Sequence, residues 1–367
     1  MRASPLAFCL LAALLATANA ADRIILRNLE LITDRTVLSV DEDGARLDAP
    51  RKSGSDRVTW DEIERGRVSP ELQEEFNRFQ TELGPPLYQL RQRLRIGDYA
   101  GLLAPAEKLS GVFAERRSQT AYLVCQSLMW GRLAAGQREQ AVEPLLRCVA
   151  LLESGAADPL RLPGARRLLL GNSSPLCGDL PPVWLNQAAA KEVLPAVQKL
   201  VREPAQRRPS QFYLYYASLA SEAGDFDEAS KVLGALTAAG DGDRQAQQIV
   251  RAQIEIQRKL PGGATSGLAQ IADGESSLPA ELAGYWRGVH LLAASDVDQQ
   301  RDGLLALLSI PAKEQTQYSE LAAAALHRSA IALAQLGDVA GAAAVRRELS
   351  SRYAATAVGV QSLGTGK

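Results

Sequence analysis

The chain has 367 residues, enough for two or three domains, and its 41 Lys and Arg against 42 Asp and Glu give a net charge of −1. No long basic run stands out against this balance, so nucleic acid is disfavoured as the main partner. Aromatic residues make up only 5% of the chain while Ala and Leu abound. Helices packed through small residues are therefore favoured over a β-sandwich.

The first 20 residues have the pattern of a signal peptide. Arg2 supplies a positive start, residues 6–17 form an apolar stretch too short to span a bilayer, and residues 18–20 (ANA) form a small-x-small cleavage site. An uncleaved anchor is the alternative, whereas a lipoprotein is disfavoured because Phe8 precedes Cys9 where a small residue is needed. No later segment approaches about 18 uninterrupted apolar residues. We therefore expect no transmembrane segment, and an exported protein of the periplasm or cell envelope.

Residues 21–66 contain short β-prone runs, with a hairpin signal at Asp43-Gly44 between two of them. The pattern resembles a small SH3-like or Sm-like barrel, which would be too small to be very stable alone. Some barrels of this kind bind RNA, but no aromatic pair flanked by basic residues occurs here. A structural or docking module is the favoured interpretation. A connecting helix is predicted next, because Ser69-Pro70 is a helix start and Gly84-Pro85-Pro86 a helix stop.

A turn glycine followed five positions later by a small or apolar residue recurs between predicted amphipathic helices. The four instances are Gly97 with Leu102, Gly136 with Ala141, Gly224 with Ala229, and Gly337 with Ala342. This pattern resembles the tetratricopeptide (TPR) family, whose helix-turn-helix units of about 34 residues stack into a superhelix. The glycines are 39, 88 and 113 residues apart, which excludes a regular array. Atypical helix pairs must fill the gaps, one of them beginning at Leu278.

Prolines and glycines alternate through residues 155–183, so this stretch is predicted to be a functional loop or a docking element that covers an edge. Trp184 at its end is expected in the core. The predicted fold is mainly α: a TPR-like α-solenoid of helix-turn-helix pairs preceded by a small β-barrel-like module. The predicted divisions are 1–20 signal peptide, 21–66 β-module, 67–84 connecting helix, 85–154 helical repeats, 155–185 Pro/Gly-rich loop, 186–356 helical repeats, and 357–367 disordered tail.

The mature chain would keep three cysteines, and export permits a disulfide. Cys125 lies 11 residues before Gly136 and Cys148 lies 12 after it, so antiparallel helices turning there bring both to nearly the same height. A Cys125–Cys148 disulfide is the favoured prediction. Two core thiols, or a Cys148–Cys177 bridge, are the alternatives.

No pattern for catalysis or metal binding occurs in the sequence: there is no HExxH, CxxC or Gly-x-Ser-x-Gly motif. The two histidines, His290 and His327, lack an acidic partner at helical spacing. We therefore predict no enzyme, no catalytic, cofactor-binding or metal-binding residues, and no cofactor.

The aromatic run at residues 212–216 is the most informative patch for function. Tyr213 and Tyr216 match packing positions of the first TPR helix, so Phe212 and Tyr215 face either a neighbouring helix pair or a ligand groove. We accordingly treat Phe212 and Tyr215 as candidate partner-binding residues. The expected function is an exported, non-enzymatic scaffold that binds a protein or peptide through the concave face of its repeats. A purely architectural or self-associating envelope protein is the alternative, and an unfamiliar enzyme is a more remote one.

Overall fold

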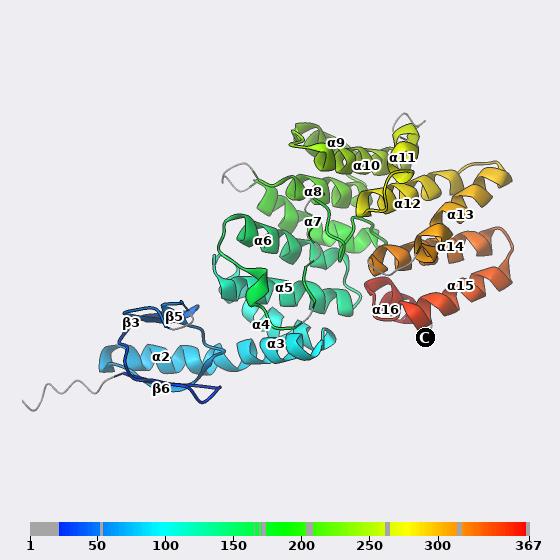
Figure 1. Cartoon of the computed structure of the whole chain (residues 1–367). Coiled ribbons are helices and arrows are strands. Elements are labelled where there is room, and N and C mark those ends of the chain that lie inside the picture. The colour runs from blue at the N-terminus through cyan, green and yellow to red at the C-terminus, as the bar shows by residue number, and fades with distance from the viewer. Residues whose placement is uncertain are drawn as a thin grey trace, which may run out of the picture.

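The computed structural model describes residues 22–51, 54–164, 166–168, 170, 174–202, 208–260, 265–313 and 318–364. The predicted signal peptide, residues 1–20, lies outside the described residues. The fold is mostly helical, with helices packed in neighbouring antiparallel pairs after a small N-terminal module of strands (Figure 1). This confirms the predicted α-solenoid of helix pairs.

The N-terminal module consists of two small antiparallel sheets with a helix between them (Figure 1). One sheet has the strand order β2-β1-β6, with β1 Arg23–Leu26, β2 Leu31–Ile32 and β6 Ile63–Arg67. The other has the strand order β3-β4-β5, with β3 Val37–Asp41, β4 Gly44–Leu47 and β5 Arg57–Val58. Helix α2, Pro70–Glu82, contacts both sheets through β3 and β6.

Because α2 supplies much of its core, the module is not one closed barrel, and the predicted connecting helix belongs to the module itself. The ring of Trp60 lies 5.2 Å from that of Phe76 and 5.7 Å from that of Phe79, both on α2. The predicted hairpin at Asp43-Gly44 is confirmed, since Asp41 pairs with Gly44 across β3 and β4. Gly44 has φ +139°, and a Cβ there would meet the carbonyl oxygen of Val58.

Within the part of the chain that the structure describes, six helix pairs and two further helices follow. The pairs are α3 Gly84–Ile96 with α4 Leu103–Phe113, α5 Gln119–Ala134 with α6 Val142–Glu153, α8 Ser210–Ala223 with α9 Phe226–Ala235, α10 Asp241–Gln257 with α11 Thr265–Ala272, α12 Leu278–Leu292 with α13 Val297–Ala312, and α14 Ser319–Gln335 with α15 Val339–Arg352. Helix α7, Gln187–Arg202, packs on α8, and α16, Ala357–Gly364, ends the described chain. Short 3₁₀ turns lie at Ala100–Leu102, Glu139–Ala141 and Pro159–Arg161.

The four predicted turn glycines each end the first helix of a pair in the left-handed conformation. Their φ angles are 75° for Gly97, 76° for Gly136, 90° for Gly224 and 83° for Gly337. Glycine adopts this conformation without the steric cost that a Cβ imposes, so the chain can turn at once into the second helix. The predicted pair beginning at Leu278 is α12 with α13, whereas α7 and α10 carry no turn glycine and were not predicted individually.

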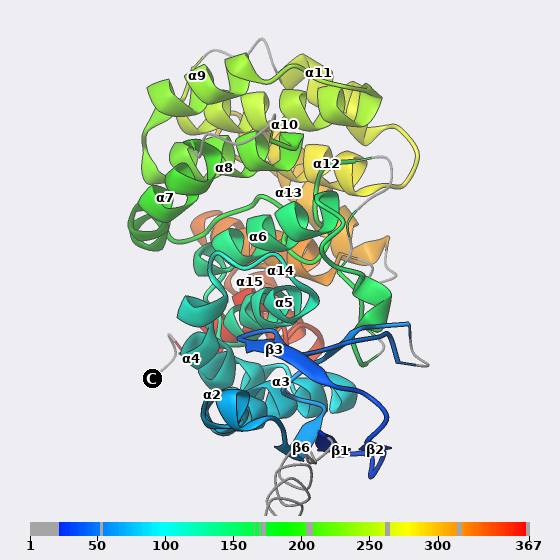
Figure 2. The same cartoon turned by 90° about the vertical axis from the view of Figure 1, so that its left-hand side faces the viewer.

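The C-terminal tail, expected to be disordered from residue 357, forms α16 instead. Ala357 and Val358 are 0% and 1% exposed, and α16 contacts α5 as well as α14 and α15. Helix α16, which packs on α14 and α15, also contacts α5, so the end of the solenoid returns to an early pair (Figures 1 and 2). The prediction failed because a small-residue tail becomes helical when a long-range partner buries it.

Candidate functional site

The inner side of the solenoid is filled by the second half of the predicted loop. We call residues 175–186 the central segment; residues 175–184 are all buried, although none lies in a helix or a sheet. They pass between the turn after α5, helix α8, and the elements α14 and α16 from the far end of the chain. The loop was predicted to be functional or to cover an edge, and the burial of its second half in the interior contradicts the second of these alternatives.

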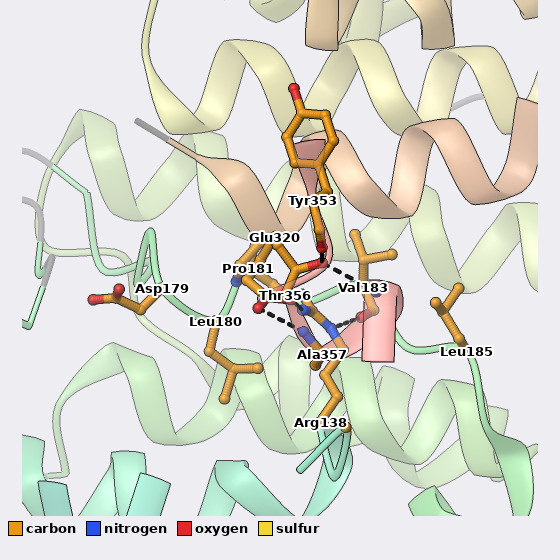
Figure 3. A network of polar contacts seen from close by, with 12 residues as sticks. Arg138, Asp179, Leu180, Pro181, Val183, Leu185, Glu320, Tyr353, Thr356 and Ala357 are labelled. Carbon is orange, nitrogen blue, oxygen red and sulfur yellow. Dashed lines mark hydrogen bonds and ion pairs between the residues drawn. The ribbon is translucent and has the colours of Figure 1, made fainter. Parts of the chain in front are cut away.

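Arg138 holds the central segment to the end of the solenoid (Figure 3). Its Nε donates to the carbonyl oxygen of Val183 and its Nη2 to that of Pro181, both at 2.7 Å, while Nη1 donates to Oε2 of Glu320 at 2.6 Å. The other carboxylate oxygen of Glu320 accepts the N–H of Ala357, the first residue of α16, at 2.9 Å. One buried guanidinium thus joins the α5–α6 turn, the central segment and α14, and Glu320 extends the link to α16.

The charges in this network are almost fully desolvated. The side chains of Arg138 and Glu320 are 1% and 6% exposed. Burial raises the pKa of Glu320, while the guanidinium of Arg138 and the N–H of Ala357 oppose that rise. Removing either Arg138 or Glu320 would therefore leave the other charge buried without its partner.

Tyr215, one of the two candidate partner-binding residues, forms two hydrogen bonds with the backbone of the central segment. Its hydroxyl donates to the carbonyl oxygen of Leu180 at 2.6 Å and accepts the N–H of Cys177 at 2.9 Å. Trp184 packs against the same ring at 6.3 Å between centroids, and its indole N–H donates to Ser218 Oγ at 2.8 Å. Tyr215 is 0% exposed, so it offers no surface to a partner. Trp184 is a core anchor, as predicted.

Glu139 and Arg166 make further contacts with the central segment, Glu139 at its C-terminal end and Arg166 within its first half. One carboxylate oxygen of Glu139 accepts the N–H groups of Leu185 and Asn186, each at 3.1 Å. The guanidinium of Arg166 pairs with Asp179 at 2.6 Å. Arg138, Glu139 and Tyr215 therefore bind backbone groups of the central segment, as a peptide-binding site binds the backbone of its ligand, but within one chain.

The three cysteines are free thiols in the structure, so the predicted Cys125–Cys148 disulfide is not formed. Cys125 is 7%, Cys148 0% and Cys177 1% exposed, and each packs as a small apolar residue of the core. Burial raises the pKa of Cys125 to about 12 and raises that of Cys148 well above its ordinary value.

Native protein should therefore resist alkylation at pH 8, where roughly one Cys125 in ten thousand is a thiolate if its pKa is about 12. Iodoacetamide is expected to label none of the three cysteines before unfolding and all three in 8 M urea without reductant. Recovery of only one thiol from the unfolded, unreduced exported protein would show that a disulfide forms after all. Peptide mapping would then identify the pair.

A pocket of about 570 Å³ opens where α4, α6 and α7 end and α8 begins. Its charged lining comprises Arg116, Arg117, Arg147, Lys199 and Arg208 against only two acids, Glu115 and Glu153. Its buried wall is mostly apolar and comprises Phe113, Cys125, Leu151, Leu200 and Phe212. We call this site the cationic pocket.

Two of these cations are exposed and available. The side chains of Arg117 and Lys199 face solvent, and neither forms an ion pair within the part of the chain that the structure describes. Arg147 pairs with Glu143 and donates to the carbonyl oxygen of Ala114, which closes the end of α4. Helix α8 starts at the pocket after Pro209 with no side-chain cap, so its first-turn N–H groups add to the preference for an anion.

The structure separates the two candidate partner-binding residues. Phe212 lies in the wall of the cationic pocket, 1% exposed, with the guanidinium of Arg208 5.2 Å from its ring centroid. Tyr215 points to the central segment on the other side of α8. The aromatic run therefore lies on a helix, α8, that contacts both the cationic pocket and the central segment. The cations of the pocket were missed because they come from four separate parts of the sequence.

Comparisons with protein-family models, with curated proteins and with solved structures find no match for this chain. Within the described ranges, no helix is long and apolar enough to cross a membrane. The same residues contain no group of three or more His, Cys, Asp or Glu arranged to hold a metal ion.

Proposed function

We propose that the protein is an exported, non-enzymatic scaffold of TPR-like helix pairs that binds an acidic segment of a partner protein in the cationic pocket. The signal-peptide pattern of residues 1–20 supports export to the periplasm or cell envelope. The four left-handed turn glycines support the TPR likeness. Burial raises the pKa of Cys125, the thiol in the pocket wall, to about 12, so it stays protonated and is a poor nucleophile, which favours binding over catalysis.

The observation that carries the proposal is the make-up of the pocket. Five cations against two acids surround an apolar wall at the meeting point of four helices. Carboxylates form charge-assisted hydrogen bonds with guanidinium and ammonium groups, and an apolar side chain of the ligand would pack on Phe212 and Leu200. An acidic peptide with one aromatic residue satisfies both requirements.

The concave face is the site that the TPR resemblance implies, but the central segment occupies it. A partner there would have to expose Trp184 and Tyr215, which are 1% and 0% exposed. It would also separate Arg138 and Glu139 from the backbone groups that they bind. Exposing large buried side chains costs about 1.5–3 kcal/mol each, so an open pocket is the more accessible site.

Reversing the two available cations, in Arg117→Glu/Lys199→Glu, is expected to weaken binding of an acidic probe about ten- to thirtyfold. Each exposed ion pair contributes up to about 1 kcal/mol, and the changes at two sites add. The probe is a fluorescein-labelled, C-amidated peptide of six glutamates around one phenylalanine, followed by fluorescence anisotropy at low ionic strength. Binding should weaken as salt is added.

A matched control separates the pocket from net charge. Lys191→Glu/Arg287→Glu makes the same change in charge at two exposed residues that do not line the pocket, and should bind the probe within about threefold of the unmodified protein. Equal weakening in both double variants would refute a defined site. Equal binding of a glutamine version of the peptide would refute the requirement for acidic groups.

A purely architectural or self-associating role is the second candidate, favoured by the inner face that the chain fills by itself. It predicts no saturable binding of the probe to the unmodified protein. Sedimentation velocity then decides between a monomer and a self-associated form.

A further inference from the structure

We propose that the tip of the β3–β4 hairpin is a built-in competitor for the cationic pocket, which an acidic partner displaces from Arg116. The inference rests on the proposed function, because it concerns regulation of the same site. The tip is the two-residue turn Glu42-Asp43, which places two carboxylates at the end of the β3–β4 hairpin.

Arg116 connects the hairpin to the pocket. It lines the pocket just beyond the end of α4, and its guanidinium pairs with the carboxylate of Glu42 and lies 3.7 Å from that of Asp43. An acidic group of the N-terminal module therefore already occupies one of the five cations. A ligand carboxylate that approaches this guanidinium must share it with Glu42 or displace Glu42 from it.

The two acids of the turn differ in their burial and in their bonding partners. Asp43 accepts a hydrogen bond from Ser118 Oγ, the N-cap of α5, and its side chain is 12% exposed. Its pKa is raised by burial, and the hydrogen bond from Ser118 opposes the rise. Glu42 is 32% exposed and, among the described residues, forms its ion pair with Arg116 alone. Asp43 thus anchors the hairpin against α5, while Glu42 is free to exchange.

Displacing Glu42 from Arg116 should cost little free energy and should change the affinity for the probe measurably. A partly exposed ion pair contributes little, because water and salt replace it easily. Removing Glu42 should free Arg116 for the ligand and strengthen binding by about three- to fivefold. Because the effect runs through one guanidinium, it should vanish when that guanidinium is absent.

The test measures the acidic probe peptide on Glu42→Gln, with Asp48→Asn as the control. Asp48 is an exposed acid of the same module, and its replacement makes the same change in net charge. We expect about three- to fivefold tighter binding for Glu42→Gln and less than twofold for Asp48→Asn. On an Arg116→Gln background, Glu42→Gln should change affinity by less than twofold. Hydrogen exchange at residues 41–44 should quicken when the probe binds the unmodified protein.

The outcomes separate the two proposals. If Arg117→Glu/Lys199→Glu weakens binding about ten- to thirtyfold but Glu42→Gln binds no tighter than Asp48→Asn, the pocket stands and the competitor is refuted. An equal gain with and without Arg116 would show a general charge effect and would also refute it. If the unmodified protein does not bind the probe at all, both proposals fail together.

Discussion

Replacing Arg138 with methionine is expected to destabilise the fold by about 3–5 kcal/mol at pH 8, the usual cost of breaking a buried ion pair from one side. The substitution leaves the carboxylate of Glu320, 6% exposed, with the N–H of Ala357 as its remaining partner. It also removes the donors to the carbonyl oxygens of Pro181 and Val183. Urea unfolding followed by circular dichroism measures the loss.

The loss should depend on pH in a defined direction. Burial already raises the pKa of Glu320, and removing the guanidinium, which lowers it, raises it further. In the variant the folded-state pKa is above the unfolded one, so the protonated carboxyl supports folding at low pH. This support is lost as pH rises through the folded pKa. The deficit against the unmodified protein should therefore be smaller at pH 5.5 than at pH 8.

The control is the double variant Arg138→Met/Glu320→Gln, which removes both charges and keeps an amide oxygen to accept the N–H of Ala357. It should recover a large part of the stability at pH 8, because no unpaired buried charge remains. Equal stability losses in the single and double variants, without pH dependence, would mean that Arg138 acts through packing alone.

Ending the chain after Thr356 is expected to cost about 2.5–6 kcal/mol, although it removes only a short C-terminal stretch. Val358 is 1% exposed, and re-exposing such a side chain costs about 1.5–3 kcal/mol. The loss of the N–H of Ala357 from Glu320 leaves a buried carboxylate oxygen without its donor, which costs about 1–3 kcal/mol more. Gln361 also donates its side-chain amide to the carbonyl of Gly136.

The matched control ends the chain after Gly364, which removes only residues outside the described part. Its urea midpoint should equal that of the full chain. If both truncations are equally stable, α16 contributes nothing and the expectation of a disordered tail from residue 357 is restored.

The turns of the solenoid were predictable because their signal is local. A left-handed glycine between amphipathic helices can be recognised within a dozen residues, as at Gly224 and Gly337. The strands of the N-terminal module were visible for the same reason. The core of this module was not predictable. Helix α2 packs between the two sheets, and the alternating pattern of a strand does not show which element covers its apolar face.

The interior could not be read from one sequence because its partners are far apart. Arg138 and Glu320 are separated by 182 residues, and neither stands in a motif. The Pro/Gly composition of residues 155–183 showed that no long helix forms there, but composition does not distinguish a surface loop from a buried one. The cations of the pocket were hidden likewise, since helices must stack before Arg117 and Lys199 meet.

We infer that the chain fills its own inner face, and we propose that an acidic partner binds at the cationic pocket outside it. Hydrogen exchange read by mass spectrometry, with and without saturating acidic probe peptide, tests this most directly. We expect increased protection in the last turns of α4 and α6 and in the first turn of α8, with exchange in residues 176–186 unchanged. Faster exchange in residues 176–186 on binding, with no change at the pocket, would contradict it and return the partner site to the concave face.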